Sequence, residues 1–186
     1  MTFVDEIAES KGEAEWLSWK DKVIDSMDEI AAFVARRRKG GEAERIVHYY
    51  RGSFNICIHI KFKDTGPDAI IRFPKAGVTA FRDEKVEKEV QVMKFLSQNT
   101  TIPLPRLISW GLTVESPQEL GPFIIMDYVE GTHLSDILKK PTLSNREKEI
   151  LNPDIDDTTL DIIYRQIADI MLQFYEIDFS HIGGHL

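Results

Sequence analysis

Apolar residues recur at steps of three and four between Glu13 and Arg38, and this spacing predicts an amphipathic helix. One apolar stripe runs along it, formed by Trp16, Trp19, Val23, Met27, Ile30 and Val34. The basic run Arg36–Lys39 and the two glycines after it are typical of a helix end, because cations favour the carbonyl end of the helix dipole. The same run also fits a short nuclear localisation signal.

The hydrophobic period changes to two from Arg45 onwards, which is typical of β-strands. A strand leads to the corner Arg51–Asn55, and in the next strand isoleucines alternate with more polar residues up to Phe62. Asp64–Pro67 has the composition of a turn, and Asp68–Phe73 is expected to be the third strand. Three short strands with tight connections predict an antiparallel meander.

The second half of the chain predicts a helix, then strands, then helices alone. These elements are expected over Asp83–Ser97, Arg106–Thr113, Pro122–Val129, Thr132–Leu138 and Thr159–Asp178. Strands followed by helices are typical of an α+β fold, and a boundary near Glu130 is expected to divide it. The expected parts are an N-terminal helical extension over residues 1–41, a sheet-bearing lobe over residues 42–130 and a helical part over residues 131–186.

The composition of the chain limits the classes of protein to which it can belong. With 42% hydrophobic residues the chain can form a packed core, and its net charge of −8 argues against nucleic acid and anionic membranes as partners. Cys57 is the one cysteine, which excludes an internal disulfide and a zinc site made of several cysteines. No apolar run approaches the roughly 20 residues of a membrane span, and the acidic N-terminus does not resemble a signal peptide. We therefore expect a cytoplasmic protein.

Two charged residues fall on faces that are otherwise apolar. Arg72 lies among apolar neighbours in the expected third strand, and Glu89 lies on the helix face that also carries Val86 and Met93. A carboxylate in such a place needs a partner, and the planar guanidinium of an arginine suits it. We therefore expect an ion pair between the two. From the pattern alone, that pair is either a structural contact or a device that holds the arginine for a ligand. The pattern also fits a glutamate that merely lies at the edge of the apolar stripe.

Five segments that follow one another in the chain carry a resemblance to a known family. They are GSFNICIHIKF, AIIRFP, RDEKVEKEVQVMKFL, IPLPRLISWG and FIIMDYVEGTHLSDIL. In this order they resemble the N-terminal part of aminoglycoside phosphotransferase-like proteins, specifically the fungal branch of that phosphotransferase family. The resemblance implies an α+β fold with a protein-kinase-like N-lobe, which is a five-stranded antiparallel sheet plus a helix. An N-terminal helix precedes this lobe, and the first helices of a truncated C-lobe follow it.

The resemblance also implies roles for particular residues in binding Mg·ATP. The loop that covers the phosphates, through backbone N–H groups and a serine hydroxyl, is matched by Gly52, Ser53, Phe54 and Asn55. Arg72 matches the cation that holds the α- and β-phosphates, a lysine in the best-studied members, and Glu89 matches the carboxylate that fixes it. The strand end and hinge whose backbone meets adenine are matched by Met126, Asp127, Tyr128 and Val129. Without the resemblance, those four also fit a buried edge strand that leads into a linker.

The catalytic loop of that family has no counterpart in this sequence. Phosphoryl transfer needs ligands for Mg²⁺ and a residue that orients the attacking hydroxyl, which the family takes from a His-Gly-Asp loop. None of the five histidines is followed by Gly-Asp. The acidic run Asp154–Asp157 precedes a helix, where carboxylates stabilise the N-terminus, although such a run can also hold a cation. His181 and His185 are expected to belong to a frayed tail. We therefore assign no catalytic residue and no metal ligand.

These observations leave more than one hypothesis for the function. In the first, the chain is the nucleotide-binding lobe of an ATP-dependent phosphotransferase that acts on a small-molecule hydroxyl, without the catalytic loop. In the second, it is a non-catalytic, pseudokinase-like protein that binds a nucleotide, or a protein partner that covers the surface left by the missing C-lobe. In the third, it is a truncated gene product without activity.

Overall fold

The computed structural model describes residues 3–38, 41–140 and 150–177, with side chains from Lys11 onwards. Its residues form two compact units. The first comprises Met1–Leu96 and Pro103–Val129, and the second comprises Ser97–Ile102 and Glu130–Leu186. The residues expected to form an N-terminal extension therefore belong to the same unit as the sheet.

Two helices begin the first unit where the sequence predicted one. α1 spans Phe3–Asp25 and α2 spans Met27–Arg38, so the helical region also begins earlier than the apolar spacing indicated. The interruption falls at Ser26, whose Oγ donates a hydrogen bond of 2.7 Å to the carbonyl oxygen of Lys22. A serine hydroxyl that bonds back to the preceding turn competes with the helical ladder and bends helices. The apolar stripe continues across the break: its buried members are Trp16, Trp19, Val23, Ile30 and Val34, with Met27 partly buried beside them.

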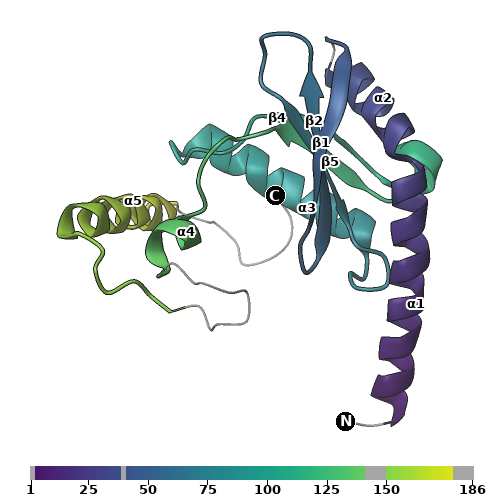
Figure 1. Ribbon diagram of the computed structural model, residues 1–186, viewed down its shortest axis with the longest axis horizontal. Helices are drawn as coiled ribbons and strands as arrows, with labels where there is room; N and C mark the ends of the chain where they lie inside the picture. The colour runs from purple at the N-terminus through teal and green to yellow at the C-terminus, as the bar shows by residue number, and fades with distance from the viewer. Residues whose placement is uncertain (1–2, 39–40, 141–149, 178–186) are drawn as a thin grey trace. The chain divides into compact units, whose positions relative to one another are not determined.

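The strands form one antiparallel sheet of five, in the order β1-β2-β3-β5-β4 (Figure 1). They are β1 (Ala43–Arg51), β2 (Asn55–Phe62), β3 (Ala69–Pro74), β4 (Leu107–Gly111) and β5 (Phe123–Asp127). β1, β2 and β3 form the predicted meander, and β5 then pairs with β3, which leaves β4 at the edge. The α+β class and the five-stranded antiparallel sheet are confirmed. The loop between β4 and β5 contains two short 3-10 turns, η1 (Thr113–Glu115) and η2 (Pro117–Glu119).

Different helices cover the two faces of the sheet (Figure 1). α1 and α2 pack on one face, where their apolar stripe joins Ile56 and Ile58 of β2 in the larger core. α3 (Arg82–Asn99), predicted over Asp83–Ser97, lies on the other face, where two of its valines contact Ile124 of β5. Because strand residues alternate between faces, Cys57 and His59 of β2 belong to the face of α3.

The contact between α1 and the rest of the first unit is close. Trp19 Nε1 donates a hydrogen bond to the carbonyl oxygen of Leu120, and Lys22 Nζ donates one of 2.6 Å to the carbonyl oxygen of Gln118. Within α1, Gly12 meets Gly77, which lies in the loop after β3. A Cβ atom on either glycine would lie within 2.5 Å of the other's carbonyl oxygen, so this approach of two backbones requires glycine.

β1 does not show the two-residue period that the sequence predicted. Its burial pattern repeats every three residues, with Ala43, Ile46 and Tyr49 partly buried and two exposed residues after each. The pairing of β1 with β2 shifts register between Ala43 and Arg45 and again between Ile46 and His48. Each irregularity adds an unpaired residue to the edge strand and so changes which face the next side chain takes.

The described residues of the second unit contain two helices and a short bridge. α4 spans Leu134–Leu138 and α5 spans Asp157–Tyr175, and an isolated β-bridge joins Lys139 to Leu151. The apolar stripe predicted for the long helix is present, but none of the described side chains of α5 is buried. None of the described helices is long and apolar enough to cross a membrane.

Candidate functional site

Arg72 and Glu89 meet as the sequence predicted. Arg72 Nη2 donates a hydrogen bond of 2.6 Å to Glu89 Oε1. The arginine lies on β3 and the glutamate on α3, so the pair links the sheet to the helix on this face. Their side chains are 20% and 34% exposed, which places the pair at the border between core and solvent. The ion pair is confirmed, and the phosphate-holding role of Arg72 stays a prediction.

The register of the sheet explains why Arg72 reaches α3. Ile71 of β3 points into the larger core, so the next residue along the strand belongs to the opposite face. Arg72 stands opposite Ile124 of β5, which contacts the buried valines of α3. Glu89 lies between those valines in sequence and is partly exposed. The apolar contact of α3 with β5 thus brings the carboxylate to the guanidinium.

Glu89 uses one N–H group of the Arg72 guanidinium. The other side-chain N–H groups of Arg72 have no hydrogen-bond partner within the described ranges. Cys57 is the cross-strand neighbour of Arg72, and burial raises the pKa of its thiol more than the nearby guanidinium lowers it. A thiol with a raised pKa stays protonated at neutral pH and is a poor nucleophile. This place therefore offers donors to an anion, and no nucleophile.

The corner between β1 and β2 is an exposed tip made by Gly52, Ser53 and Phe54. The Gly52 N–H donates to the carbonyl oxygen of Asn55 at 3.0 Å, so this amide is used within the turn. The Ser53 and Phe54 amides and the Ser53 hydroxyl have no hydrogen-bond partner in the part of the chain that the structure describes. Gly52 does not have a positive φ, and a Cβ there would lie at an ordinary 3.5 Å from the Asn55 carbonyl oxygen. This turn therefore does not require its glycine.

Two further cations adjoin this corner on the face of α1. The Lys75 N–H donates to the carbonyl oxygen of Phe54 at 2.9 Å. Lys75 Nζ lies 4.4 Å from the centre of a Trp16 ring, and the Arg51 guanidinium lies 5.0 Å from it. Burial, together with repulsion from Arg51, lowers the pKa of Lys75. Because Trp16 belongs to the larger core, these cations pack on the face opposite Arg72.

The expected hinge, Met126–Val129, ends β5 and leaves the sheet with most of its amides in use. The Asp127 N–H donates to the carbonyl oxygen just before β4 at 3.0 Å, and the Tyr128 N–H donates to that of Asp68 at 2.8 Å. The Val129 N–H has no partner among the described residues, and its side chain is 67% exposed. Val129 is therefore the residue of this segment whose amide can donate to a ligand.

The carboxylate of Asp127 has a structural partner. Arg106 donates to it through Nε and Nη2, with both distances at 2.8 Å. This two-point contact fastens the end of β5 to the residue before β4. The side chain of Asp127 is thus occupied, and the expected part of its backbone in meeting adenine stays a prediction.

The sequence did not predict a cluster of polar and aromatic side chains beside this segment. It consists of Tyr50, His59, Asp68 and Tyr128. His59 Nε2 lies 2.8 Å from Asp68 Oδ2, and the His59 and Tyr128 rings stack with centres 3.7 Å apart and planes at 10°. The Tyr50 and Tyr128 hydroxyl oxygens are 3.2 Å apart. A histidine within an isoleucine-rich strand, followed by an aspartate at the start of the next strand, was the available signal.

The acidic run before α5 serves as a helix start. The Asp156 carboxylate accepts hydrogen bonds from the Thr159 N–H at 2.8 Å and from its hydroxyl at 2.7 Å, and these bonds lower the pKa of Asp156. Across the described ranges, no group of three or more His, Cys, Asp or Glu side chains is arranged to hold a metal ion. The tail histidines His181 and His185 lie outside the described residues.

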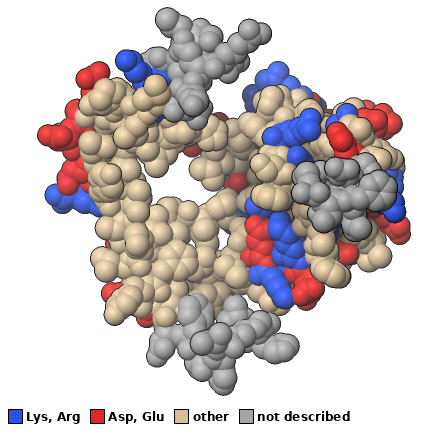
Figure 2. All heavy atoms as spheres, turned by 90° about the horizontal axis from the view of Figure 1, so that it is seen from below, with Lys and Arg blue, Asp and Glu red and all other residues tan. Residues whose placement is uncertain are grey.

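Two arginines of the basic run Arg36–Lys39 make contacts within the first unit. Arg38 donates to both carboxylate oxygens of Asp64, at 2.5 and 2.9 Å, and lies 4.2 Å from the centre of the Phe62 ring. Arg37 lies 5.1 Å from the centre of the Phe33 ring. These contacts favour the helix-end interpretation over a localisation signal. On the face shown in Figure 2, Lys and Arg side chains lie among Asp and Glu rather than in one continuous positive area.

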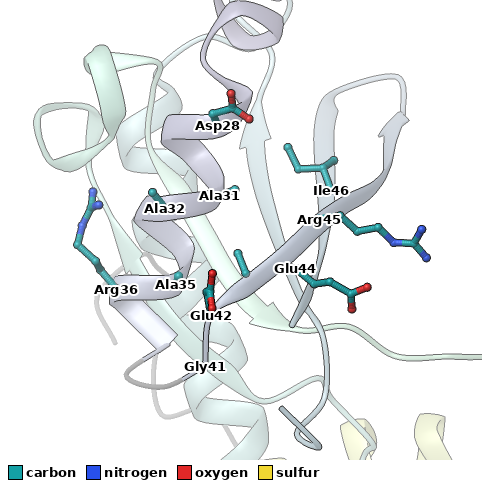
Figure 3. Close-up of a pocket in the computed structure, with 11 residues that line it drawn as sticks. Asp28, Ala31, Ala32, Ala35, Arg36, Gly41, Glu42, Glu44, Arg45 and Ile46 are labelled. Carbon is teal, nitrogen blue, oxygen red and sulfur yellow. The ribbon is translucent and has the colours of Figure 1, made fainter. Parts of the chain in front are cut away.

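A groove of about 790 Å³ lies between α2 and β1, away from the Arg72 pair (Figure 3). Alanines of α2 and the residues Gly41–Ile46 line it. Arg36 and Arg45 point away from the space between helix and strand, while Asp28 and Glu42 border it (Figure 3). Such a lining attracts no anion, so we place the candidate site at Arg72 rather than in this groove.

The comparisons with known proteins give one weak similarity. No family model matches the sequence, and no solved structure matches it. The protein named "Altered inheritance of mitochondria protein 9, mitochondrial", from Scheffersomyces stipitis, is 25% identical over 123 residues. The match covers 64% of this chain and 18% of that protein, so the chain spans less than a fifth of the relative's length. A similarity of this extent does not assign the chain to a family.

Proposed function

We propose that this chain is the nucleotide-binding lobe of an ATP-dependent phosphotransferase that acts on a hydroxyl group of a small molecule. The observation that carries the proposal is the ion pair of Arg72 with Glu89, 2.6 Å between Nη2 and Oε1. It joins a strand-borne cation to a helix-borne carboxylate, and protein-kinase-like folds fix the cation that binds nucleotide phosphates with such a pair.

The architecture of the first unit supports the finer fold assignment, a protein-kinase-like N-lobe. The sheet has β3, which carries the cation, as its middle strand. α3, which carries the carboxylate, follows β3 in the chain and packs against the sheet. The corner between β1 and β2 corresponds to the phosphate-covering loop, and β5 runs into Met126–Val129 as a strand runs into a hinge.

Each residue has a defined task in this proposal. Arg72 binds the α- and β-phosphates through the N–H groups that Glu89 leaves unused. The Val129 N–H donates to the nucleobase, and the amides of Ser53 and Phe54 cover the phosphates. ATP supplies the phosphoryl group that is transferred. The described residues contain no set of Mg²⁺ ligands, and the proposal assigns none to them.

Titration calorimetry with Mg·ATP tests the proposal. The wild-type protein is expected to bind, and Arg72→Ala is expected to lose binding because the phosphates lose their cation. Arg38→Ala and Cys57→Ser are the controls: Arg38 pairs with Asp64 instead, and Cys57 contributes no charge. Equal affinity in wild type and Arg72→Ala would overturn the site, and no binding by wild type would overturn the nucleotide-binding function.

A second candidate function, binding of a protein partner without catalysis, is favoured by α5. Met171, Leu172 and Tyr175 on this helix are 66%, 60% and 88% exposed. Large apolar side chains exposed together are typical of a surface that another protein or another part of a chain covers. Recovery of the chain in a stable complex, with no thermal shift on adding Mg·ATP, would favour this function over the first.

We propose a cytoplasmic location for the protein, as the sequence led us to expect. Among the described helices, none is long and apolar enough to cross a membrane. The relative from Scheffersomyces stipitis is mitochondrial by its name, so the alternative to a cytoplasmic location is a mitochondrial one. Subcellular fractionation with an antibody against α1 separates the two. Recovery in the mitochondrial fraction would overturn the cytoplasmic assignment.

A further inference from the structure

We propose that His59 and Asp68 are positioning residues for the segment Met126–Val129, and that they act through Tyr128. The proposal extends the proposed function, because it names what fixes the segment expected to meet the nucleobase. Its structural part concerns contacts within the first unit and is testable without a nucleotide.

Asp68 bonds three places at once. Its main-chain oxygen accepts the Tyr128 N–H at 2.8 Å. One carboxylate oxygen lies 2.8 Å from His59 Nε2, and the other accepts the Phe62 N–H at 3.2 Å. Asp68 directly precedes β3, and both oxygens of its carboxylate are engaged by β2, one by the His59 ring and the other by the Phe62 N–H. A change at the carboxylate therefore reaches the carbonyl that holds the Tyr128 amide.

Tyr128 is held at its ring as well as at its amide. The His59 ring stacks on it at 3.7 Å between centres, nearly parallel at 10°. The hydroxyl oxygen of Tyr128 lies 3.2 Å from that of Tyr50 on β1. His59 is 6% exposed, so the ring on which Tyr128 stacks is fixed in the interior. Contacts from β1, β2 and the start of β3 thus converge on one residue of the segment.

The contacts of His59 also define its tautomer. Its Nε2 faces a carboxylate, whereas its Nδ1 is buried and has no partner among the described residues. A proton on Nδ1 would leave a buried donor without an acceptor, which is costly. The neutral ring therefore carries its proton on Nε2 and donates to Asp68, which keeps the ring in one orientation.

Val129 follows Tyr128 directly and has an amide without a partner in the described structure. The direction of that N–H depends on the backbone of Tyr128, because the two residues share a peptide plane. Holding Tyr128 by its amide and its ring therefore aims the Val129 donor. This is the physical sense in which His59 and Asp68 position the segment.

Amide hydrogen exchange by NMR on the full chain tests the structural part. His59→Phe keeps a stacking ring and removes the hydrogen bond to Asp68. We expect the exchange of the Tyr128 amide to rise about tenfold relative to the amides of the β2–β3 ladder, the effect of one lost bond to a charged group. His48→Phe is the matched control, because His48 is the exposed cross-strand neighbour of His59 and makes no contact with Asp68, and phenylalanine keeps the aromatic ring that packs on Tyr50 at 4.6 Å between centres.

Several results would overturn the proposal. One is an unchanged exchange rate of the Tyr128 amide in His59→Phe. Another is an equal rise in the exchange rates of the Tyr128 amide and of the β2–β3 amides, because a merely structural role would affect all of them alike. Asp68→Asn gives a second variant should His59→Phe not fold, and it is expected to raise Tyr128 exchange in the same selective way. On wild type, ¹⁵N shifts are expected to identify the Nε2–H tautomer of His59, and the Nδ1–H tautomer would contradict it.

Titration with Mg·ATP adds the functional arm. His59→Phe is expected to weaken binding several-fold while His48→Phe binds as wild type does. Equal affinity in wild type and His59→Phe would overturn the coupling to the nucleotide. Failure of wild type to bind Mg·ATP would overturn the proposed function, and the exchange experiment would still decide whether His59 and Asp68 position Tyr128.

Discussion

Arg72 Nη2 donates to Glu89 Oε1 across 2.6 Å, and this bond connects the middle strand of the sheet to α3. The glutamate occupies one corner of the guanidinium and leaves its other donors unpaired within the described residues. An arrangement of this kind orients a cation without neutralising all of its hydrogen-bonding capacity.

The first prediction concerns the energy of this pair. Glu89→Ala is expected to lower the free energy of unfolding by about 1 kcal/mol, since a partly exposed ion pair contributes little more. Glu87→Ala, an exposed position on the same helix, is expected to change it by less than about 0.5 kcal/mol. Urea denaturation measures both. A double-mutant cycle with Arg72→Ala that shows no coupling would contradict a specific bond between the two side chains.

The second prediction compares two glycines. Gly77 has a φ of +72°, and a Cβ there would meet the Gly12 carbonyl oxygen and the Trp16 amide nitrogen. Gly77→Ala is therefore expected to destabilise the protein by at least about 2 kcal/mol. Gly52→Ala, in the corner between β1 and β2, is expected to be neutral because neither its φ nor its surroundings require glycine. Thermal unfolding distinguishes the two variants. Similar melting temperatures for Gly77→Ala and Gly52→Ala would contradict a special requirement for glycine at position 77.

The third prediction tests whether α1 is part of the core. Val23 is fully buried, and its neighbour Ile24 is 44% exposed on the same helix. Val23→Ala is expected to cost about 2 kcal/mol of stability through lost burial and a residual cavity. Ile24→Ala, which removes more atoms, is expected to cost less than about 0.5 kcal/mol. Chemical denaturation provides the values, and the reverse order would mean that α1 does not pack as described.

The fourth prediction follows from Arg38 and Asp64. The guanidinium holds the pKa of Asp64 below its ordinary value of 3.8, because it stabilises the charged carboxylate in the folded protein. The unfolded chain then binds the proton more readily, so this contribution is present above pH 3.8 and is lost as the pH falls below it. Asp64→Asn is expected to lower the melting temperature at neutral pH and to flatten its fall in acid.

The control for this experiment is the arginine. In an Arg38→Ala background, Asp64→Asn is expected to change the acid part of the pH profile much less, because the largest cause of the lowered Asp64 pKa is gone and the Gly66 N–H remains as the smaller one. An unaltered effect of Asp64→Asn in that background would show that another group is responsible.

Local patterns allowed much of the fold to be predicted. The apolar stripe of α1 and α2, the meander and the helix α3 each depend on periodicity within one segment, and the structure has them. The contact of Arg72 with Glu89 was also predictable, because two charges on apolar faces of neighbouring elements have few other partners.

The features that were missed depend on contacts across the chain or on single hydrogen bonds. The helix break falls at Ser26, whose hydroxyl bonds to the Lys22 carbonyl oxygen, and apolar spacing contains no sign of it. Pairing between distant segments places β5 next to β3. It also brings the Tyr128 N–H to the carbonyl oxygen of Asp68, to which it donates. The apolar stripe of α5 was predicted, but periodicity cannot tell whether a partner is present to bury it.

The bond from Trp19 to Leu120 spans 101 positions of sequence, and that from Lys22 to Gln118 spans 96. During synthesis, α1 leaves the ribosome long before the residues that complete its packing exist. The tryptophans of α1 thus stay without their final neighbours until the chain has reached η2 and β5, when the core can close. We expect the first unit to fold late in its own translation, as a unit rather than helix by helix, and nascent chains that end before Phe123 to remain sensitive to protease.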